Sequence, residues 1–166
     1  RLLARANRIS QDSRFLEAFN KGLAVILKAQ YPTGGWPQKY PPGKGYNRHI
    51  TFNDHAMVRL LYLLRDIAQS SEFEFVSAEN RAAAEQAFDR GIACILNCQI
   101  RVNGKRTVWC AQHDAEDLKP QSARSYERIS LSGSESAEIL RLLMRLDNPS
   151  ERVIRAVQAG VRWYCL

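Results

Sequence analysis

An internal repeat with a constant period constrains the fold of this chain more than any other feature of its sequence. The segment from Lys21 to Gln30 resembles the segment from Arg90 to Gln99, and the residues from Ala159 to Arg162 begin a third copy. The glycines at positions 22, 91 and 160 keep a constant offset of 69 residues. Repeated helical units of this length bury their apolar faces only against their neighbours. The sequence therefore predicts an array of stacked helical units.

Each unit of the array is predicted to be a helical hairpin with a long connection. Apolar residues at helical spacing run from Phe15 to Leu27, from Met57 to Ile67 and through residues 78–98. The loop over residues 30–50 is rich in proline and glycine, so it cannot continue a helix. We place the repeats at about residues 10–69 and 78–147, with the start of a third at 150–166. We expect an all-α fold of (α/α) toroid type, with helical hairpin repeats, long functional loops and an incomplete toroid.

The second long loop, over residues 99–130, carries its own local structure. The stretch from Ile100 to Trp109 predicts two short strands about an Asn-Gly turn. A further helix follows this loop and ends at Asn148-Pro149, and the last helix begins near Ser150. The last helix would leave an apolar face unpaired around Trp163. We therefore expect the chain to be the N-terminal part of a single longer catalytic domain.

Charge favours a polyanionic partner for this protein. Lysine and arginine number 24 against 17 aspartates and glutamates, a formal charge of +7. Such a balance suits nucleic acid, an anionic membrane or an acidic polysaccharide. No apolar run reaches the ~20 residues needed to span a bilayer. Cys94 and Cys98 lie four apart in a predicted helix, where two residues facing a core are favoured over metal or disulfide chemistry.

Aromatic and cationic residues gather on the two long loops, as a binding site for an acidic sugar polymer requires. Rings pack on pyranose faces, and arginine or lysine pairs with uronate carboxylates. The substrate-binding candidates are Trp36, Lys39, Tyr40, Trp109, His113 and Tyr126. For His113, a structural hydrogen-bonding role is favoured over zinc or hydrolase chemistry, because the sequence lacks partners at usual ligand spacing.

Two acidic residues stand out in this basic and aromatic surround. Asp54 and Asp114 offer the carboxylate oxygens that Ca²⁺ prefers. A helix N-cap is an equally good interpretation of Asp54. For Asp114 the alternative is a salt bridge to Arg124 or Lys119.

These motifs resemble polysaccharide lyase family 10, the pectate lyases with an (α/α) toroid. The resemblance rests on Gln30–Gln38, Ile50–Asp54, Trp109–Asp114, Ala123–Glu127 and Leu131–Ser136, in that order and at similar spacing. Together they cover almost the whole chain. A departure from the family is His55, which stands where relatives commonly carry another residue.

The resemblance implies an activity and a cofactor. Such lyases cleave α-1,4-polygalacturonate by β-elimination, with Ca²⁺ stabilising the negative charge that develops as the C5 proton leaves. The resemblance places calcium contacts on Asp54 and Asp114. It also implies an arginine as the base. Arg124 matches a family position and is the catalytic candidate within the chain, although it could instead bind uronate, and the base is expected to lie beyond Leu166.

Two other functions stay open at this stage. The same loops could form a non-catalytic module for acidic polysaccharides, or an inactive fragment of such a lyase. A nucleic-acid-binding helical repeat fits the charge, but the basic residues are mixed with acids and aromatics instead of lining one helix. We expect a polygalacturonate-binding protein with no nucleic-acid or membrane partner, monomeric when complete. A polymeric substrate also implies a secreted or periplasmic location, although no signal peptide is visible.

Overall fold

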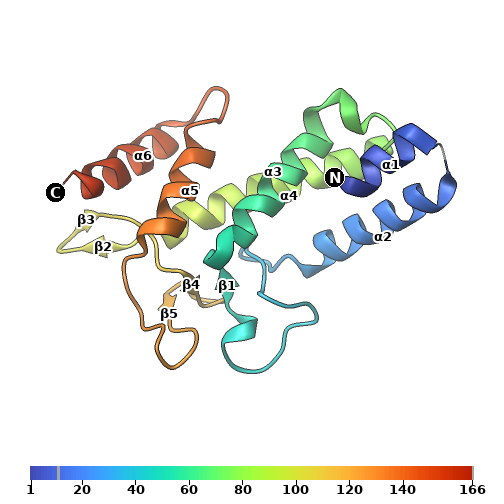
Figure 1. The fold of residues 1–166 in the computed structure, drawn as a ribbon. Coiled ribbons are helices and arrows are strands. Elements are labelled where there is room, and N and C mark those ends of the chain that lie inside the picture. The colour runs from blue at the N-terminus through green and yellow to red at the C-terminus, as the bar shows by residue number, and fades with distance from the viewer. Residues whose placement is uncertain (11, 166) are drawn as a thin grey trace.

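The computed structural model describes residues 1–10 and 12–165, and Gln11 and Leu166 lie outside them. Helices dominate the architecture, as the sequence predicts (Figure 1). The α-helices are α1 (Leu2–Ser10), α2 (Ser13–Ala29), α3 (Ala56–Gln69), α4 (Ala78–Cys98), α5 (Gly133–Leu143) and α6 (Glu151–Tyr164). Short 3₁₀ turns are η1 (Gly45–Arg48), η2 (Asn53–His55) and η3 (Ser71–Phe73). The all-α prediction is therefore confirmed, and the arrangement is consistent with part of a toroid.

Helix starts follow capping chemistry that is visible in the sequence. The side chain of Asp12 accepts a hydrogen bond from the backbone N–H of Arg14 at the start of α2. Ser77 caps α4 in the same way, and Ser150 caps α6. These oxygens satisfy N–H groups that have no partner inside the helix. The cap at Ser150 agrees with the predicted start of the last helix.

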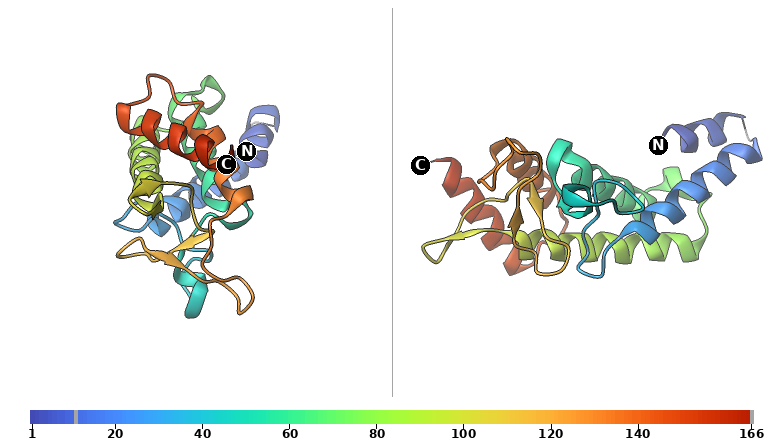
Figure 2. Two further views of the ribbon diagram at one scale, coloured as in Figure 1. Left: turned by 90° about the vertical axis from the view of Figure 1, so that its left-hand side faces the viewer. Right: turned by 90° about the horizontal axis from the view of Figure 1, so that it is seen from below.

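The helices stack so that each packs mainly against its neighbours in the chain. α3 runs along α4, α5 packs on α6, and α4 also contacts α2 and α6. The core between them is apolar and fully enclosed, with Leu61 and Leu64 on α3, Ile95 on α4 and Ile139 on α5 all at 0% exposure. Cys94 and Cys98 also face this core, as predicted. The molecule is elongated, with its two termini towards opposite ends (Figure 2).

The two long loops make equivalent hydrogen bonds in successive copies of the repeat. The indole N–H of Trp36 donates to the carbonyl oxygen of Ile26 at 2.8 Å, and that of Trp109 donates to Ile95 at 2.7 Å. Ile26 and Ile95 are themselves 69 positions apart. Each acceptor lies in the last turn of a helix, where carbonyl groups lack intrahelical donors. The same bond thus fixes the start of each loop to its own helix.

A second equivalent pair of bonds links each copy to the next. The side-chain amide of Gln30 donates to the carbonyl oxygens of Gly34 at 2.9 Å and Ala87 at 2.8 Å. The amide of Gln99 donates to Thr107 at 3.0 Å and to Ala156 at 2.9 Å. Each glutamine therefore joins its own loop to the following long helix, α4 or α6.

Short strands tie the two loops to each other. The strands are β1 (Ile50–Thr51), β2 (Arg101–Val102), β3 (Lys105–Arg106), β4 (Gln112–His113) and β5 (Pro120–Gln121). β2 and β3 form the predicted hairpin, with positive φ at both Asn103 and Gly104. β1, β4 and β5 form an antiparallel sheet in the order β1-β4-β5, in which Ile50 pairs with His113. This sheet joins the first loop to the second, and the sequence did not predict it.

None of the helices in residues 1–10 and 12–165 has the length and apolar character to cross a membrane.

The repeat glycines differ in their surroundings, which gives a test of the packing. A Cβ atom on Gly91 would lie 2.4 Å from a methyl group of the buried Leu61, whereas a Cβ on Gly22 would meet nothing within 4 Å. We expect Gly91→Ala to lower the free energy of unfolding by about 1–3 kcal/mol through overpacking. Gly22→Ala should raise it by up to about 1 kcal/mol, because alanine favours the helix.

Denaturant unfolding of the two variants beside the unmodified chain measures both effects. Equal effects of the two substitutions would contradict the packing described for α3 and α4.

Candidate functional site

The long loops meet on one side of the helices, where the β1-β4-β5 sheet holds them together (Figure 1). Three hydrogen bonds reinforce this junction. Both Phe52 and Asn53 donate backbone N–H groups to the carbonyl oxygen of Ala111. The side-chain amide of Gln112 donates to Oε1 of Gln38 at 3.2 Å. The loops of successive repeats therefore form one continuous structure, in which every predicted site residue lies at the surface or beneath it.

Asp54 projects from a strained turn between β1 and α3. Its φ is +52°, and that of the adjacent His55 is +61°, both in the left-handed region that residues other than glycine rarely adopt. Such strain is found preferentially at functional sites. The alternative of a helix N-cap does not apply, because α3 has its cap position at His55 and no side chain bonds there. The exposed carboxylate of Asp54 is thus left open to solvent.

Asp114 follows β4 and is half-buried. Its Oδ1 accepts hydrogen bonds from the backbone N–H groups of Glu116 at 2.8 Å and Asp117 at 3.3 Å. The alternative of a salt bridge does not apply either, since Lys119 pairs with Asp117 at 2.7 Å and Arg124 pairs with Glu127. One oxygen of Asp114 therefore orders the turn, and the other accepts no hydrogen bond from the described residues.

The two carboxylates do not form a closed metal cage. Asp54 lies beyond the C-terminal end of β1 and Asp114 beyond that of β4, and because these strands are antiparallel the residues flank opposite ends of the ladder. Within the described part of the chain, no three His, Cys, Asp or Glu side chains cluster closely enough to hold a metal ion. Carboxylate oxygens suit Ca²⁺, which takes six to eight oxygen ligands. A calcium ion here would need carbonyl, water or substrate oxygens to complete its shell.

Two side chains of the first loop hold this surface in place. The hydroxyl of Thr33 donates to the carbonyl oxygen of Ala115, the residue after Asp114, at 2.7 Å. The phenol of Tyr31 donates to the carbonyl oxygen of Arg48 at 2.7 Å. Burial raises the pKa of Tyr31, while the nearby charges of Arg48 and Asp114 lower and raise it respectively. Sequence analysis did not single out Tyr31 or Thr33, because their partners are backbone atoms of distant residues.

Arg124 is locked in a bidentate ion pair. Its Nη2 lies 2.5 Å from Oε1 of Glu127 and its Nε 2.9 Å from Oε2, while the guanidinium stacks 4.8 Å from the ring centroid of Tyr126. The hydrogen bond to Glu127 raises the pKa of Arg124 further above its ordinary value. The same pair lowers the pKa of Glu127 to about 2. A general base needs a pKa near the working pH. This pairing stabilises the charged form of Arg124, and the base role suggested for this residue stays a prediction.

The remaining candidates divide into exposed and enclosed residues. Lys39, Tyr40 and Tyr126 are exposed and can reach a ligand on the loop surface. Trp36 is 2% exposed, and Trp109 and His113 are at 0%. The two indoles pack in the core through the helix bonds described above, so their rings offer no face to a sugar. The structure thus gives these two residues a packing role in place of the ring stacking predicted for them.

His113 has an environment that keeps its ring neutral. Its Nδ1 lies 2.8 Å from the carbonyl oxygen of Leu118, to which it donates, and Nε2 is buried without a partner among the described residues. Burial lowers the pKa of His113 to about 4. The ring of Phe52 packs edge-on against it, with centroids 5.5 Å apart. These contacts agree with the structural role favoured from the sequence.

Helical hairpins that repeat along the chain, with long loops that meet on one side, define an all-α repeat protein with a loop-built surface. The sequence matches the Pectic acid lyase family over residues 1–165. The chain therefore belongs to that family.

Two solved structures share this fold over nearly the whole chain. One is a family 10 polysaccharide lyase from Cellvibrio cellulosa, at 38% identity and a TM-score of 0.93, covering 99% of this chain and 51% of that one. The other is the D189A mutant of a family 10 polysaccharide lyase from the same organism in complex with trigalaturonic acid, also at 38% identity and a TM-score of 0.93, covering 99% and 52%. The chain thus spans about half the length of these structures. No curated protein matches it.

The neutral, buried ring of His113 predicts a loss of stability in acid. The pKa of His113 is 6.5 in the unfolded chain and about 4 in the folded chain. Between these two pH values, His113 is protonated in the unfolded chain but stays neutral in the folded chain. The contribution of neutral His113 to the free energy of unfolding is therefore complete above pH 6.5. It decreases by up to about 3 kcal/mol as the pH falls towards 4. Unfolding free energies measured across this range check the slope.

His113→Asn is the matched variant, because its amide can still donate to Leu118 but does not titrate. Its stability should vary less with pH than that of the unmodified chain. An identical pH slope in both proteins would refute the assignment.

Proposed function

We propose that this chain supplies part of a lyase that cleaves α-1,4-polygalacturonate by calcium-assisted β-elimination. Family membership supports lyase chemistry on pectate, and a relative at 38% identity was solved with trigalaturonic acid. The observation that carries the proposal is the presence of two carboxylates without a salt bridge, Asp54 and Asp114, on the loop surface that also carries Lys39, Arg124 and Tyr126. Acids left open in such a surround suit a cation that bridges protein and uronate.

Asp54 and Asp114 are the proposed calcium contacts. Bound Ca²⁺ would supply electrostatic stabilisation to the uronate carboxylate as charge develops in the transition state. The separation of the two acids along the ladder fits a site that substrate oxygens complete. Thr33 then acts as a positioning residue, because its bond to Ala115 holds the turn that carries Asp114.

Arg124 is proposed to bind a substrate carboxylate. Its ion pair with Glu127 fixes the guanidinium beside Tyr126, and arginine pairs with carboxylates in a planar, bidentate geometry. Lys39 and Tyr40 extend the exposed surface on the first loop. We assign the proton abstraction to none of these residues.

A non-catalytic module for acidic polysaccharides is the second candidate function. The observation that favours it is the ion pair of Arg124 with Glu127, which holds the guanidinium in place as a cation that could pair with a carboxylate. Both candidates imply a polygalacturonate partner. Because such a polymer is too large to enter a cell, we propose a secreted or periplasmic location for the protein. We also propose that the protein is a monomer when the domain is complete.

The calcium contacts can be tested by substitution. We expect the chain to bind polygalacturonate more tightly with Ca²⁺ than with a chelator. Asp54→Asn and Asp114→Asn should each weaken the calcium-dependent binding by about tenfold or more, because a carboxylate ligand to the cation is lost. Calorimetric titration measures the affinity, and ultraviolet absorbance of the unsaturated product reports cleavage.

Asp147→Asn is the control, since it removes an exposed carboxylate from the α5–α6 turn. Binding that neither loop variant weakens more than Asp147→Asn does would disprove the calcium assignment. Product formation would identify a lyase, and calcium-dependent binding without product would favour the binding module.

The role of Arg124 has a separate test. If it pairs with uronate, Arg124→Gln should weaken binding by about a few-fold, as for an ion pair exposed to solvent. Arg124→Lys should keep part of the affinity, because it keeps the charge but not the planar fork. If product is formed, Arg124→Lys should retain a measurable rate. Complete loss of product in Arg124→Lys with unchanged binding would show instead that Arg124 acts on the proton.

A further inference from the structure

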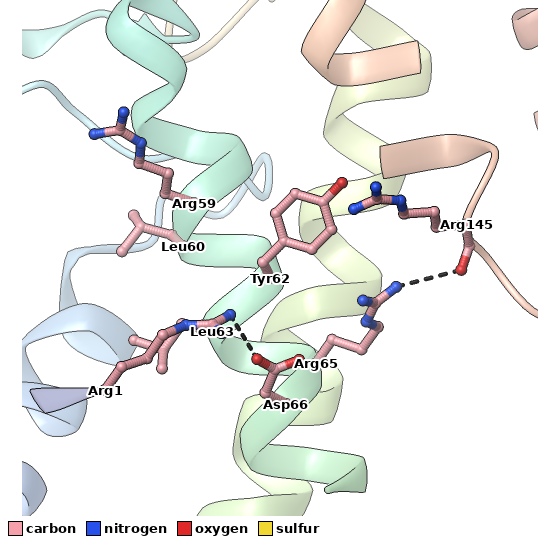
Figure 3. Close-up of a pocket in the computed structure, with 8 residues that line it drawn as sticks. All are labelled: Arg1, Arg59, Leu60, Tyr62, Leu63, Arg65, Asp66 and Arg145. Carbon is pink, nitrogen blue, oxygen red and sulfur yellow. Dashed lines mark hydrogen bonds and ion pairs between the residues drawn. The ribbon is translucent and has the colours of Figure 1, made fainter. Parts of the chain in front are cut away.

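A basic groove runs along the helices, on residues outside the two long loops. It has a volume of about 740 Å³ and lies between α1, α3 and the end of α5 (Figure 3). Four arginines line it, namely Arg1, Arg59, Arg65 and Arg145, with Asp66 as the one acidic residue in the lining. The groove therefore carries an excess of three positive charges.

The four arginines differ in whether their guanidinium groups already have a partner within the protein. Arg1 forms an ion pair with Asp66 at 2.5 Å, and Arg65 donates to the backbone carbonyl of Arg145 at 3.3 Å. The guanidinium groups of Arg59 and Arg145 have no carboxylate within 4.0 Å among the described residues. Arg59 and Arg145 therefore line one groove with guanidinium groups that no carboxylate of the described residues engages.

An aromatic ring and two leucines complete the lining. The ring of Tyr62 lies 5.3 Å from the guanidinium carbon of Arg65 and 5.9 Å from that of Arg145. In Figure 3 the side chains of Arg59 and Arg145 lie on different sides of Tyr62. Leu60 and Leu63 add partly buried apolar surface beside it. Cations that are spaced apart, with apolar surface between them, match a chain of sugar rings that carries a carboxylate on each ring.

Other anions fit this lining less well. A nucleic acid would need exposed rings for base stacking, whereas the aromatic ring of this lining, Tyr62, is half-buried. A single small anion such as phosphate would use one cation and leave the apolar surface uncovered. The lining also differs from that of the loop surface, because its acid is already paired and it offers no open carboxylate for a metal.

We propose that this groove is a second, calcium-independent binding site for a carboxylated oligosaccharide, with Arg59 and Arg145 pairing with its carboxylates. The choice of an acidic sugar rests on the proposed function of the loop surface. The groove itself is defined by residues that take no part in that function. It would hold a second segment of a long polymer while the loops engage the first.

The test is calorimetric titration of the whole chain with trigalacturonate in a chelator, which removes calcium-dependent binding at the loops. We expect binding to the unmodified chain and to Asp54→Asn. The double variant Arg59→Gln/Arg145→Gln should bind about tenfold more weakly, since it loses two charge pairs of up to about 1 kcal/mol each. Its melting temperature should change little, because the variant loses no ion pair and only the contact of Arg145 with the ring of Tyr62.

The matched control is Lys21→Gln/Lys28→Gln, which removes the same charge from α2. Binding in chelator that the groove variant alone weakens supports the site. Equal weakening by both double variants would show general charge attraction and overturn it, as would absence of binding in chelator. The test is completed by titrations with phosphate, a neutral galactose trimer and a single-stranded oligonucleotide. If any of these probes binds as tightly as trigalacturonate, the ligand assignment is overturned. Calcium-dependent binding at the loops is measured separately, so either proposal can fail alone.

Discussion

The hydrogen bonds of two tryptophans and two glutamines are the interactions on which the rest of this structure depends. Where a long loop leaves a helix, the carbonyl groups of the last turn need hydrogen-bond donors from outside the helix. Trp36 and Trp109 donate their indole N–H groups to carbonyl oxygens of the last helical turn. The ring of each tryptophan is buried in the core beside its own helix end. Gln30 and Gln99 then carry the connection across to the next long helix. Helix packing, loop direction and the relation between neighbouring hairpins all follow from these four side chains.

The loop surface proposed as the binding site is a consequence of this anchoring. Once both loops leave their helices in the same way, their edges can pair as β1 and β4, although each strand has only two residues. The pairing brings Asp54 and Asp114 onto one surface but keeps them at opposite ends of a ladder. Positive φ at Asp54 shows that the chain accepts local strain to present this carboxylate. A rigid frame that presents two carboxylates without salt bridges suits the proposed site, which its ligand would complete.

Much of the fold was predictable from sequence because its signals are local or periodic. Apolar spacing and caps placed α4 at Ala78–Cys98 and the start of α6 after Ser150, and the Asn103-Gly104 pair marked the β2–β3 turn. The β1-β4-β5 sheet was missed because two-residue strands show no periodicity. Aromatic rings in loops suggested sugar stacking, but the polar N–H of an indole can equally serve a helix end, as it does at Trp36. The pairing of Arg124 with Glu127 was also missed, since many charges stand near both in sequence.

The unequal lengths of the two loops show where this architecture tolerates change. Trp36 follows Gln30 by six positions, whereas Trp109 follows Gln99 by ten. The anchoring bonds are nevertheless the same, because the second loop folds its additional residues into the β2–β3 hairpin, which projects away from the junction. Insertions and deletions between the glutamine and the tryptophan can therefore accumulate during evolution without shifting the register of the helices. Diversification of such a protein would proceed at the hairpin tips while the anchors stay fixed.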